Sequence, residues 1–162
     1  MKRPNRILRS LYRLPLLLRL IGVRRIDLLS PVEWIIVTTR GRRTGKPYSV
    51  VLDVVGRDAP GRRWYVQPAN GRSSDWARNV AVNPLVEAEL GSRRFSARVE
   101  DVSGREGAEI VLRFIRTHPW YARLVVWLGG YTDRMDRPDD ELRASLLATP
   151  VFSIRELTAP GD

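Results

Sequence analysis

A basic turn bracketed by two glycines is the part of this sequence best suited to bind a ligand. Residues 39–46 read Thr-Arg-Gly-Arg-Arg-Thr-Gly-Lys and are followed by Pro47. Gly41 and Gly45 allow positive φ angles that aim successive backbone N–H groups inward. Charge and a hydroxyl donor come from the remaining polar side chains, Arg42, Arg43, Thr44 and Lys46. This combination predicts an anion-binding turn, and the alternative is a solvated hairpin tip.

Few other residues of the chain could carry out chemistry by themselves. The turn lacks the lysine-serine/threonine order of a Walker loop, which argues against a nucleoside triphosphatase. The chain has no cysteine and a single histidine, His118, so it offers no disulfide, Cys/His zinc site or thiol nucleophile and little support for a Ser-His-Asp arrangement. We therefore expect no metal site, and we expect the reactive atoms of any reaction to belong to a bound cofactor.

The elements that position the turn belong to one domain. A chain of 162 residues, 43% hydrophobic and 28% charged, has the composition of a soluble domain with a single core. We divide it into a basic amphipathic segment over 1–30, a barrel domain over 31–158 and a tail over 159–162. A separate N-terminal domain of that size could not bury its own core.

Short runs rich in β-branched and aromatic residues predict the strands of a mostly antiparallel sheet. They cover 33–39, 48–55, 63–67, 85–90, 94–100 and 151–157, with hairpin turns at 57–61 and 91–92. Helices are predicted from Ser73 or Ser74 to Ala81, from a capping box at 103–106 to about Arg116, over 119–128, and in a short stretch ending at Leu147. Six strands with intervening helices indicate an α+β fold, a small closed or split β-barrel.

The net charge of +10 comes mainly from the start of the chain. Eight Lys and Arg residues precede the first acid, Asp27, so little of the excess belongs to the remainder. Aromatic residues are not interleaved with these cations as a platform for stacking bases requires. We therefore do not expect nucleic acid as a partner.

Residues 1–25 combine these cations with leucines and isoleucines, a pattern typical of a basic amphipathic helix that is bent or divided at Pro15. The uninterrupted apolar run, 14–18, is too short to cross a bilayer, and no small-residue cleavage site follows it. Two interpretations stay open: a helix packed on the barrel or at a dimer seam, and a helix on an anionic membrane surface. The expected location is the cytoplasm, or the inner face of the cell membrane as a peripheral protein.

Three motifs together resemble those of the deazaflavin-dependent nitroreductase and quinone reductase family. They are Thr38 to Pro47, then Ser74 to Asn79 with Asn83-Pro84, then Thr117-His118-Pro119, within a resemblance from about Leu11 to Leu157. In that family the first motif reads as threonines followed by Gly-Arg-Lys/Arg-Ser/Thr-Gly-x-Pro, and the second as Trp-x-x-Asn before Asn-Pro. The resemblance implies a flavin-reductase-like split β-barrel, usually a homodimer. It also implies binding of the deazaflavin coenzyme F-420, with FMN as the alternative cofactor, and hydride transfer to a small-molecule acceptor.

The resemblance assigns coenzyme contacts to four stretches of the chain. They are the turn (Arg42, Arg43, Thr44), the next strand (Tyr48, Ser49, Val50, Val51, Leu52, Asp53), a loop (Gln67, Pro68, Ala69, Asn70) and a helix (Asp75, Trp76, Ala77, Arg78, Asn79). Coenzyme F-420 carries a phosphate and a polyglutamate tail, and a basic turn suits such an anion. Tyr48 stands where many relatives have arginine, which puts one contact with the tail in question.

Several of these residues also have a purely structural interpretation. Trp76, at helical spacing from Val80, can be a core residue rather than a ring-stacking ligand. Asn79 and Asn83 can cap or turn the chain. Alternation along a strand sends only every second side chain of residues 48–52 toward a ligand. His118, just before Pro119, is interpreted as a helix-entry residue with no catalytic role.

The acceptor pocket is expected after the long helix, where relatives that reduce nitroaromatics and quinones place tyrosines. Tyr121 matches one such position, whereas Leu124 replaces the next and Trp120, Trp127 and Tyr131 are added nearby, so the pocket differs. Tyr121 can donate a hydrogen bond or proton to the reduced acceptor, or it can be a packing residue. The sequence therefore predicts an oxidoreductase with a quinone-like or nitroaromatic acceptor. The alternatives are a non-catalytic cofactor or lipid carrier at the membrane surface and a basic nucleic-acid-binding barrel.

Overall fold

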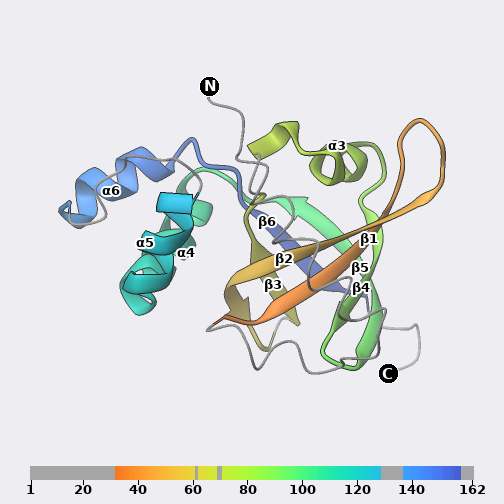
Figure 1. Ribbon diagram of the computed structural model, residues 1–162, viewed down its shortest axis with the longest axis horizontal. Helices are drawn as coiled ribbons and strands as arrows, with labels where there is room; N and C mark the ends of the chain where they lie inside the picture. The colour runs from red at the N-terminus through yellow and green to blue at the C-terminus, as the bar shows by residue number, and fades with distance from the viewer. Residues whose placement is uncertain (1–31, 61, 69–70, 129–136, 158–162) are drawn as a thin grey trace.

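Six antiparallel strands close into a barrel in the computed structural model, which describes residues 32–60, 62–68, 71–128 and 137–157 (Figure 1). The strands are β1 (Trp34–Arg40), β2 (Pro47–Asp58), β3 (Arg63–Val66), β4 (Leu85–Leu90), β5 (Arg93–Asp101) and β6 (Phe152–Glu156). Their order around the barrel is β1-β2-β3-β6-β5-β4, and β4 pairs with β1 to close it. The predicted fold class and all six predicted strands are confirmed.

The barrel closes because each strand turns one set of alternate side chains inward. Ile35 and Val37 of β1, Trp64 of β3 and Ile154 of β6 are at most 1% exposed and belong to one apolar core. Trp64 packs against Phe95 with ring centroids 5.0 Å apart. The other faces of β4 and β5 carry paired charges and polar groups, such as the ion pair between Arg94 and Glu89, which suits solvent. The alternation of buried and exposed side chains therefore determines which side of each strand is available to a ligand.

Four α-helices and one short 3-10 helix surround the barrel in the described part of the chain. They are η2 (Gly71–Ser73), α3 (Asp75–Val82), α4 (Arg105–Thr117), α5 (Pro119–Leu128) and α6 (Asp139–Leu146). Helix α3 covers one end of the barrel and contributes Trp76, Ala77 and Val80 to the barrel core. Helices α4, α5 and α6 gather on one side, around a second apolar cluster that includes Val111 and Leu142 (Figure 1). The turn between β1 and β2 projects beyond the barrel near α3.

The start of α4 differs from the predicted capping box. The N-cap residue is Gly104, with φ of 91°, and no side-chain capping hydrogen bond forms there. Ser103 instead links the chain to the start of β6, because its Oγ accepts a hydrogen bond from the Val151 backbone N–H at 3.0 Å. A positive φ at this position suits glycine, which explains why the helix begins one residue later than the box implies.

Part of the organisation predicted from the sequence lies outside the described residues. This holds for the N-terminal amphipathic helix over 1–30, for the tail over 159–162, and for Ala69, Asn70 and Tyr131. Within 32–157, leaving out the gaps named above, no helix is long and apolar enough to span a bilayer.

Candidate functional site

The turn between β1 and β2 is held by its own backbone hydrogen bonds. The Gly41 N–H donates to the Lys46 carbonyl at 2.9 Å, and the N–H groups of Gly45 and Thr44 donate to the Gly41 carbonyl at 2.7 and 3.2 Å. The Lys46 N–H lies 3.4 Å from Thr44 Oγ1. The prediction that successive N–H groups of this turn point toward a bound anion is therefore wrong for these four residues, because the folded turn already satisfies them.

The two glycines of the turn serve different purposes. Gly45 has φ of 66°, the left-handed conformation that was predicted. Gly41 is not among the positive-φ glycines, which corrects the prediction for that residue. Instead, a Cβ atom on Gly41 would lie 2.9 Å from Thr44 Oγ1 and 3.3 Å from the Lys46 carbonyl oxygen. Gly41 is needed because the turn folds back tightly over it.

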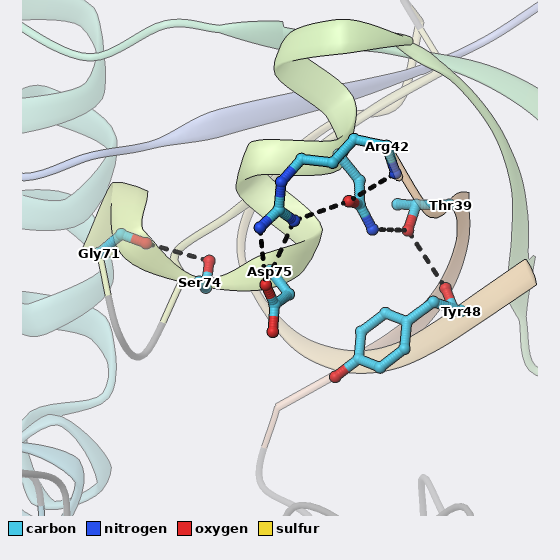
Figure 2. Close-up of polar contacts among 7 residues, drawn as sticks. Thr39, Arg42, Tyr48, Gly71, Ser74 and Asp75 are labelled. Carbon is cyan, nitrogen blue, oxygen red and sulfur yellow. Dashed lines mark hydrogen bonds and ion pairs between the residues drawn. The ribbon is translucent and has the colours of Figure 1, made fainter. Parts of the chain in front are cut away.

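Arg42 fastens the turn to helix α3, as Figure 2 shows. Its backbone N–H donates to Asn79 Oδ1 at 3.2 Å, and its guanidinium Nη1 donates to the same oxygen at 3.0 Å. Both terminal guanidinium nitrogens also lie 3.2 Å from Asp75 Oδ1. Much of the hydrogen-bonding capacity of Arg42 is therefore used inside the protein, and this arginine positions the turn more than it presents a free charge.

Asn79 connects α3 to both strands of the hairpin. Its side chain is 4% exposed, and its Nδ2 donates to Thr39 Oγ1 at 3.1 Å. The Thr39 hydroxyl in turn donates to the Tyr48 carbonyl at 3.3 Å, so one chain of hydrogen bonds runs from α3 through β1 to β2 (Figure 2). Asn79 thus links α3 to the turn and to β1. Its side chain has this cross-linking role in place of the cap or turn role considered from the sequence.

Four exposed cations lie on this turn or on the two elements that flank it. Arg40 ends β1, Arg43 and Lys46 lie on the turn, and Arg78 lies on α3. None of the four forms an ion pair with another residue in the described part of the chain, whereas Arg42 pairs with Asp75. An anionic ligand is therefore attracted to this part of the surface. The cationic side chains there can donate hydrogen bonds to a phosphate or carboxylate group of the ligand.

The beginning of β2 offers polar groups beside these cations. Tyr48 is 49% exposed, and Ser49 is also exposed. The hydroxyl oxygens of Ser49 and Thr38, which face each other across the β1–β2 pair, lie 2.8 Å apart. A ligand bound at the turn can therefore reach hydroxyl groups of two strands.

A second group of polar residues lies further along the same hairpin. Tyr121 of α5 donates a hydrogen bond from its Oη to Asp53 Oδ2 at 2.9 Å. Burial raises the pKa of Asp53, and hydrogen bonds from the side chains of Tyr121 and Trp34 oppose that rise. Asp53 is five residues beyond Tyr48, which corresponds to about 17 Å along a strand. The hairpin therefore joins a basic end to a carboxyl-phenol pair.

Several residues that the sequence assigned to the coenzyme turn their side chains elsewhere. Trp76 and Ala77 are 3% and 4% exposed within the barrel core, and Trp76 packs edge-to-face on Phe152 at 5.1 Å. Leu52 belongs to the same core, and Val50 packs against it. These four side chains therefore pack in or against the barrel core, and their contacts with the coenzyme stay a prediction. Val51, on the opposite side of β2, is also buried at 4%.

The remaining predicted contacts are divided. Gln67 is half-buried, and Pro68 is buried and accepts a hydrogen bond from the Gly71 N–H at 2.9 Å. Asp75 is exposed at the start of α3, near the turn. The sequence reasoning missed Trp34 beside Asp53. The sequence held a signal for this contact. If the two strands that flank the turn pair as a hairpin with Arg40 opposite Pro47, the same register places Trp34 opposite Asp53.

Comparison with known proteins gives a family match and shared folds. The family described as F420H(2)-dependent quinone reductase matches residues 18–135. A solved "F420-H2 Dependent Reductase (FDR-A)" is 21% identical, with a TM-score of 0.51, and the match covers 76% of this chain and 94% of that one. A structure described as a domain-swapped dimer is 19% identical, with a TM-score of 0.51 and coverage of 87% and 95%. No curated protein matches the chain.

A third solved structure, of a protein of unknown function from Agrobacterium tumefaciens, is 15% identical with a TM-score of 0.51. That match covers 77% of this chain and 48% of the other. At these identities the structures support the barrel fold alone, whereas the family match covers most of the chain and both ends of the hairpin site.

Proposed function

We propose how this chain, which belongs to the F420H(2)-dependent quinone reductase family, carries out the family's reaction. The family assignment makes it an oxidoreductase that transfers hydride from the reduced coenzyme to a quinone-like acceptor. In our proposal the basic turn binds the anionic part of coenzyme F-420, and the acceptor is reduced beside Tyr121. Nitroaromatic compounds are a second acceptor class within the same proposal.

The observation that carries this proposal is the set of unpaired cations on a turn that is itself immobilised. Arg42 and Asn79 hold the turn against α3, so Arg43 and Lys46 present their charges without first ordering the backbone. The phosphate and carboxylates of the coenzyme are the kind of group that such side chains bind. Arg43, Lys46 and the hydroxyl of Ser49 are the residues that we expect to contact it, with Arg40 and Arg78 at the margin.

The reduced deazaflavin supplies the hydride when it is bound, and the protein supplies binding, orientation and a proton donor. Holding the coenzyme and the acceptor together in one site is the larger part of the protein's contribution, because reactants held in the right orientation react far faster than reactants free in solution. Tyr121 contacts the hairpin through Asp53, and its hydroxyl can donate to an oxygen atom of the acceptor as negative charge develops there.

A binding titration tests the role of the turn. Purified protein is titrated with coenzyme F-420 and, in parallel, with FMN, and the coenzyme is expected to bind more tightly. Arg43→Ala and Lys46→Ala should each weaken coenzyme binding about tenfold or more, because each removes one charge-assisted contact. Arg98→Ala is the matched control, since it removes an exposed arginine from β5, which is not adjacent to β1 or β2 in the barrel.

Unchanged affinity in both turn variants would remove the turn from the coenzyme site. Tight binding without oxidation of the reduced coenzyme by any quinone would identify a carrier instead of an enzyme. Binding to nucleic acid that weakens steeply with salt, without coenzyme binding, would favour the basic binding module.

We also propose that the protein forms a homodimer. A solved structure with the same fold is described as a domain-swapped dimer, and two-fold homodimers are the commonest oligomers of soluble proteins. Light scattering at several protein concentrations measures the assembly directly, and a monomer at every concentration would contradict this part of the proposal.

A further inference from the structure

A half-buried carboxyl group lies against the tyrosine that the proposed function places at the acceptor. Asp53 Oδ2 accepts a hydrogen bond from Tyr121 Oη at 2.9 Å, and Trp34, directly opposite in the β1–β2 register, supplies a second one. Val51 and Val55, two residues before and after Asp53, are 4% and 7% exposed. The carboxyl group therefore has apolar neighbours along its own strand, one donor on the paired strand β1 and one on helix α5.

The hydroxyl of Tyr121 has a single hydrogen to donate. While Asp53 is ionised, this hydrogen is committed to the carboxylate. When Asp53 is protonated, its own O–H can donate to Tyr121 Oη, and the carboxyl group no longer holds the hydrogen of Tyr121, which can then be donated to another molecule. The two protonation states of Asp53 thus give Tyr121 opposite roles.

We propose that Asp53 is a positioning residue whose protonated form turns Tyr121 into the proton donor for the hydride acceptor. This inference rests on the proposed function. Reduction of a quinone takes up one hydride, from the C5–H bond of the coenzyme, and one proton, from the O–H bond of Tyr121. The proton of Asp53 passes to the Tyr121 oxygen, and solvent returns a proton to Asp53. The second hydrogen lost on oxidation of the coenzyme enters solvent as a proton, so the whole reaction balances.

The surroundings of Asp53 shift its titration in the direction that this role needs. Burial is the main influence and raises the pKa of Asp53, while the hydrogen bonds from Tyr121 and Trp34 lower it in part. Helix α4 meets β2 through an apolar side chain, since a Cβ atom on Gly56 would lie 2.8 Å from Ile110 Cγ2. Among the described residues, Tyr121 from α5 is the titratable group that contacts Asp53, and no charged residue is among the causes of the shift.

The first test needs neither coenzyme nor acceptor. The Asp53 carboxyl carbon is followed by ¹³C NMR during a pH titration of the full-length protein. We expect Asp53 to titrate above an ordinary aspartate, and higher still in Tyr121→Phe, because that variant lacks a donor that stabilises the carboxylate. An Asp53 carboxyl that titrates at or below the ordinary value would overturn the inference, whatever the activity of the protein.

The second test measures the pH dependence of single-turnover oxidation of reduced coenzyme F-420 by menadione. In the wild-type protein the rate should fall about tenfold per pH unit above the pKa of Asp53. Asp53→Asn should flatten this limb, because its amide donates to Tyr121 at every pH. Asp53→Glu should keep a limb, and Asp58→Asn, on the same strand, should leave it unchanged.

The outcomes separate the two proposals. An unchanged pH limb in Asp53→Asn, with normal turnover, refutes the role of Asp53 and leaves the proposed function intact. No turnover by the wild-type protein with any quinone or nitroaromatic acceptor contradicts the proposed function, and the role of Asp53 falls with it. A flattened limb together with a raised pKa of Asp53 in the free protein supports the inference.

Discussion

Replacing Asn79 with alanine should destabilise the protein by breaking the link between α3 and the β1–β2 hairpin. The amide makes three hydrogen bonds, one to Thr39 Oγ1 and two from the backbone and guanidinium of Arg42. A typical hydrogen bond contributes about 1 kcal/mol net, so the three together give about 3 kcal/mol. The estimate applies to a side chain that is 4% exposed, where water replaces the lost partners poorly.

Urea denaturation followed by far-UV circular dichroism measures this loss, and a thermal melt should shift downward by about 6–12 °C for a domain of this size. Asn83→Ala is the matched control. Asn83 is an exposed amide at the end of the same helix, and its Oδ1 accepts one hydrogen bond, from the Leu85 N–H at 3.1 Å. We expect about 1 kcal/mol or less for the control.

An Asn79→Ala protein within about 0.5 kcal/mol of the wild type would refute the reasoning, because it would mean that the hairpin holds its turn without α3. A loss equal to that of Asn83→Ala would do the same. Coenzyme affinity measured on the same variant, under conditions where it stays folded, should also fall, since Arg43 and Lys46 would then be carried by a mobile turn.

Three further predictions follow from other parts of the chain. Gly41→Ala should destabilise the turn by about 1 kcal/mol, because its Cβ would lie 3.3 Å from the Lys46 carbonyl oxygen and 2.9 Å from Thr44 Oγ1, and a urea midpoint equal to that of wild type would contradict the close packing. Because the pKa of Asp53 is raised, the folded state binds its proton up to a higher pH than the unfolded state does. Stability is therefore lost as pH rises from the unfolded pKa through the folded one, and Asp53→Asn should remove this part of the pH dependence in urea titrations. Deleting residues 1–25 should abolish cosedimentation with anionic vesicles while coenzyme binding persists, because eight basic residues lie in this segment. Loss of the fold or of the dimer in this variant would show that the segment is structural. Retained vesicle binding would place the membrane contact elsewhere in the chain.

The sequence was sufficient for the barrel because most of its strands are short, alternate in burial and are separated by clear turn residues, although β2 is longer and less regular. The predicted run 85–90 coincides with β4, and the hairpin at Gly91-Ser92 is present. The start of α4 was mispredicted because Ser103 has two uses that look alike in sequence, capping a helix or bonding a neighbouring strand. Only the nearness of Val151, far along the chain, decides between them.

The site was predictable in position more than in detail. The glycine-bracketed motif located the turn correctly, yet it could not show that Arg42 spends its donors on Asp75 and Asn79, because that depends on where α3 lies. Motif matching also gave Trp76 the same standing as Arg43, although one is buried in the core and the other exposed. Whether a residue of a motif can contact a ligand depends on whether the folded barrel buries its side chain.

Closure of the six-stranded barrel limits how a second copy of the chain can be joined. Every described strand has a hydrogen-bonded neighbour on each side, so little strand edge is left for another chain to extend the sheet, although residues 47–53 of β2 pair with β1 alone. We therefore expect assembly by contact between side-chain surfaces or by exchange of a whole segment between subunits. In both cases the strength of the assembly is set independently of the hydrogen bonds that hold each barrel, so the oligomeric state can change during evolution while the fold and its hairpin site are kept.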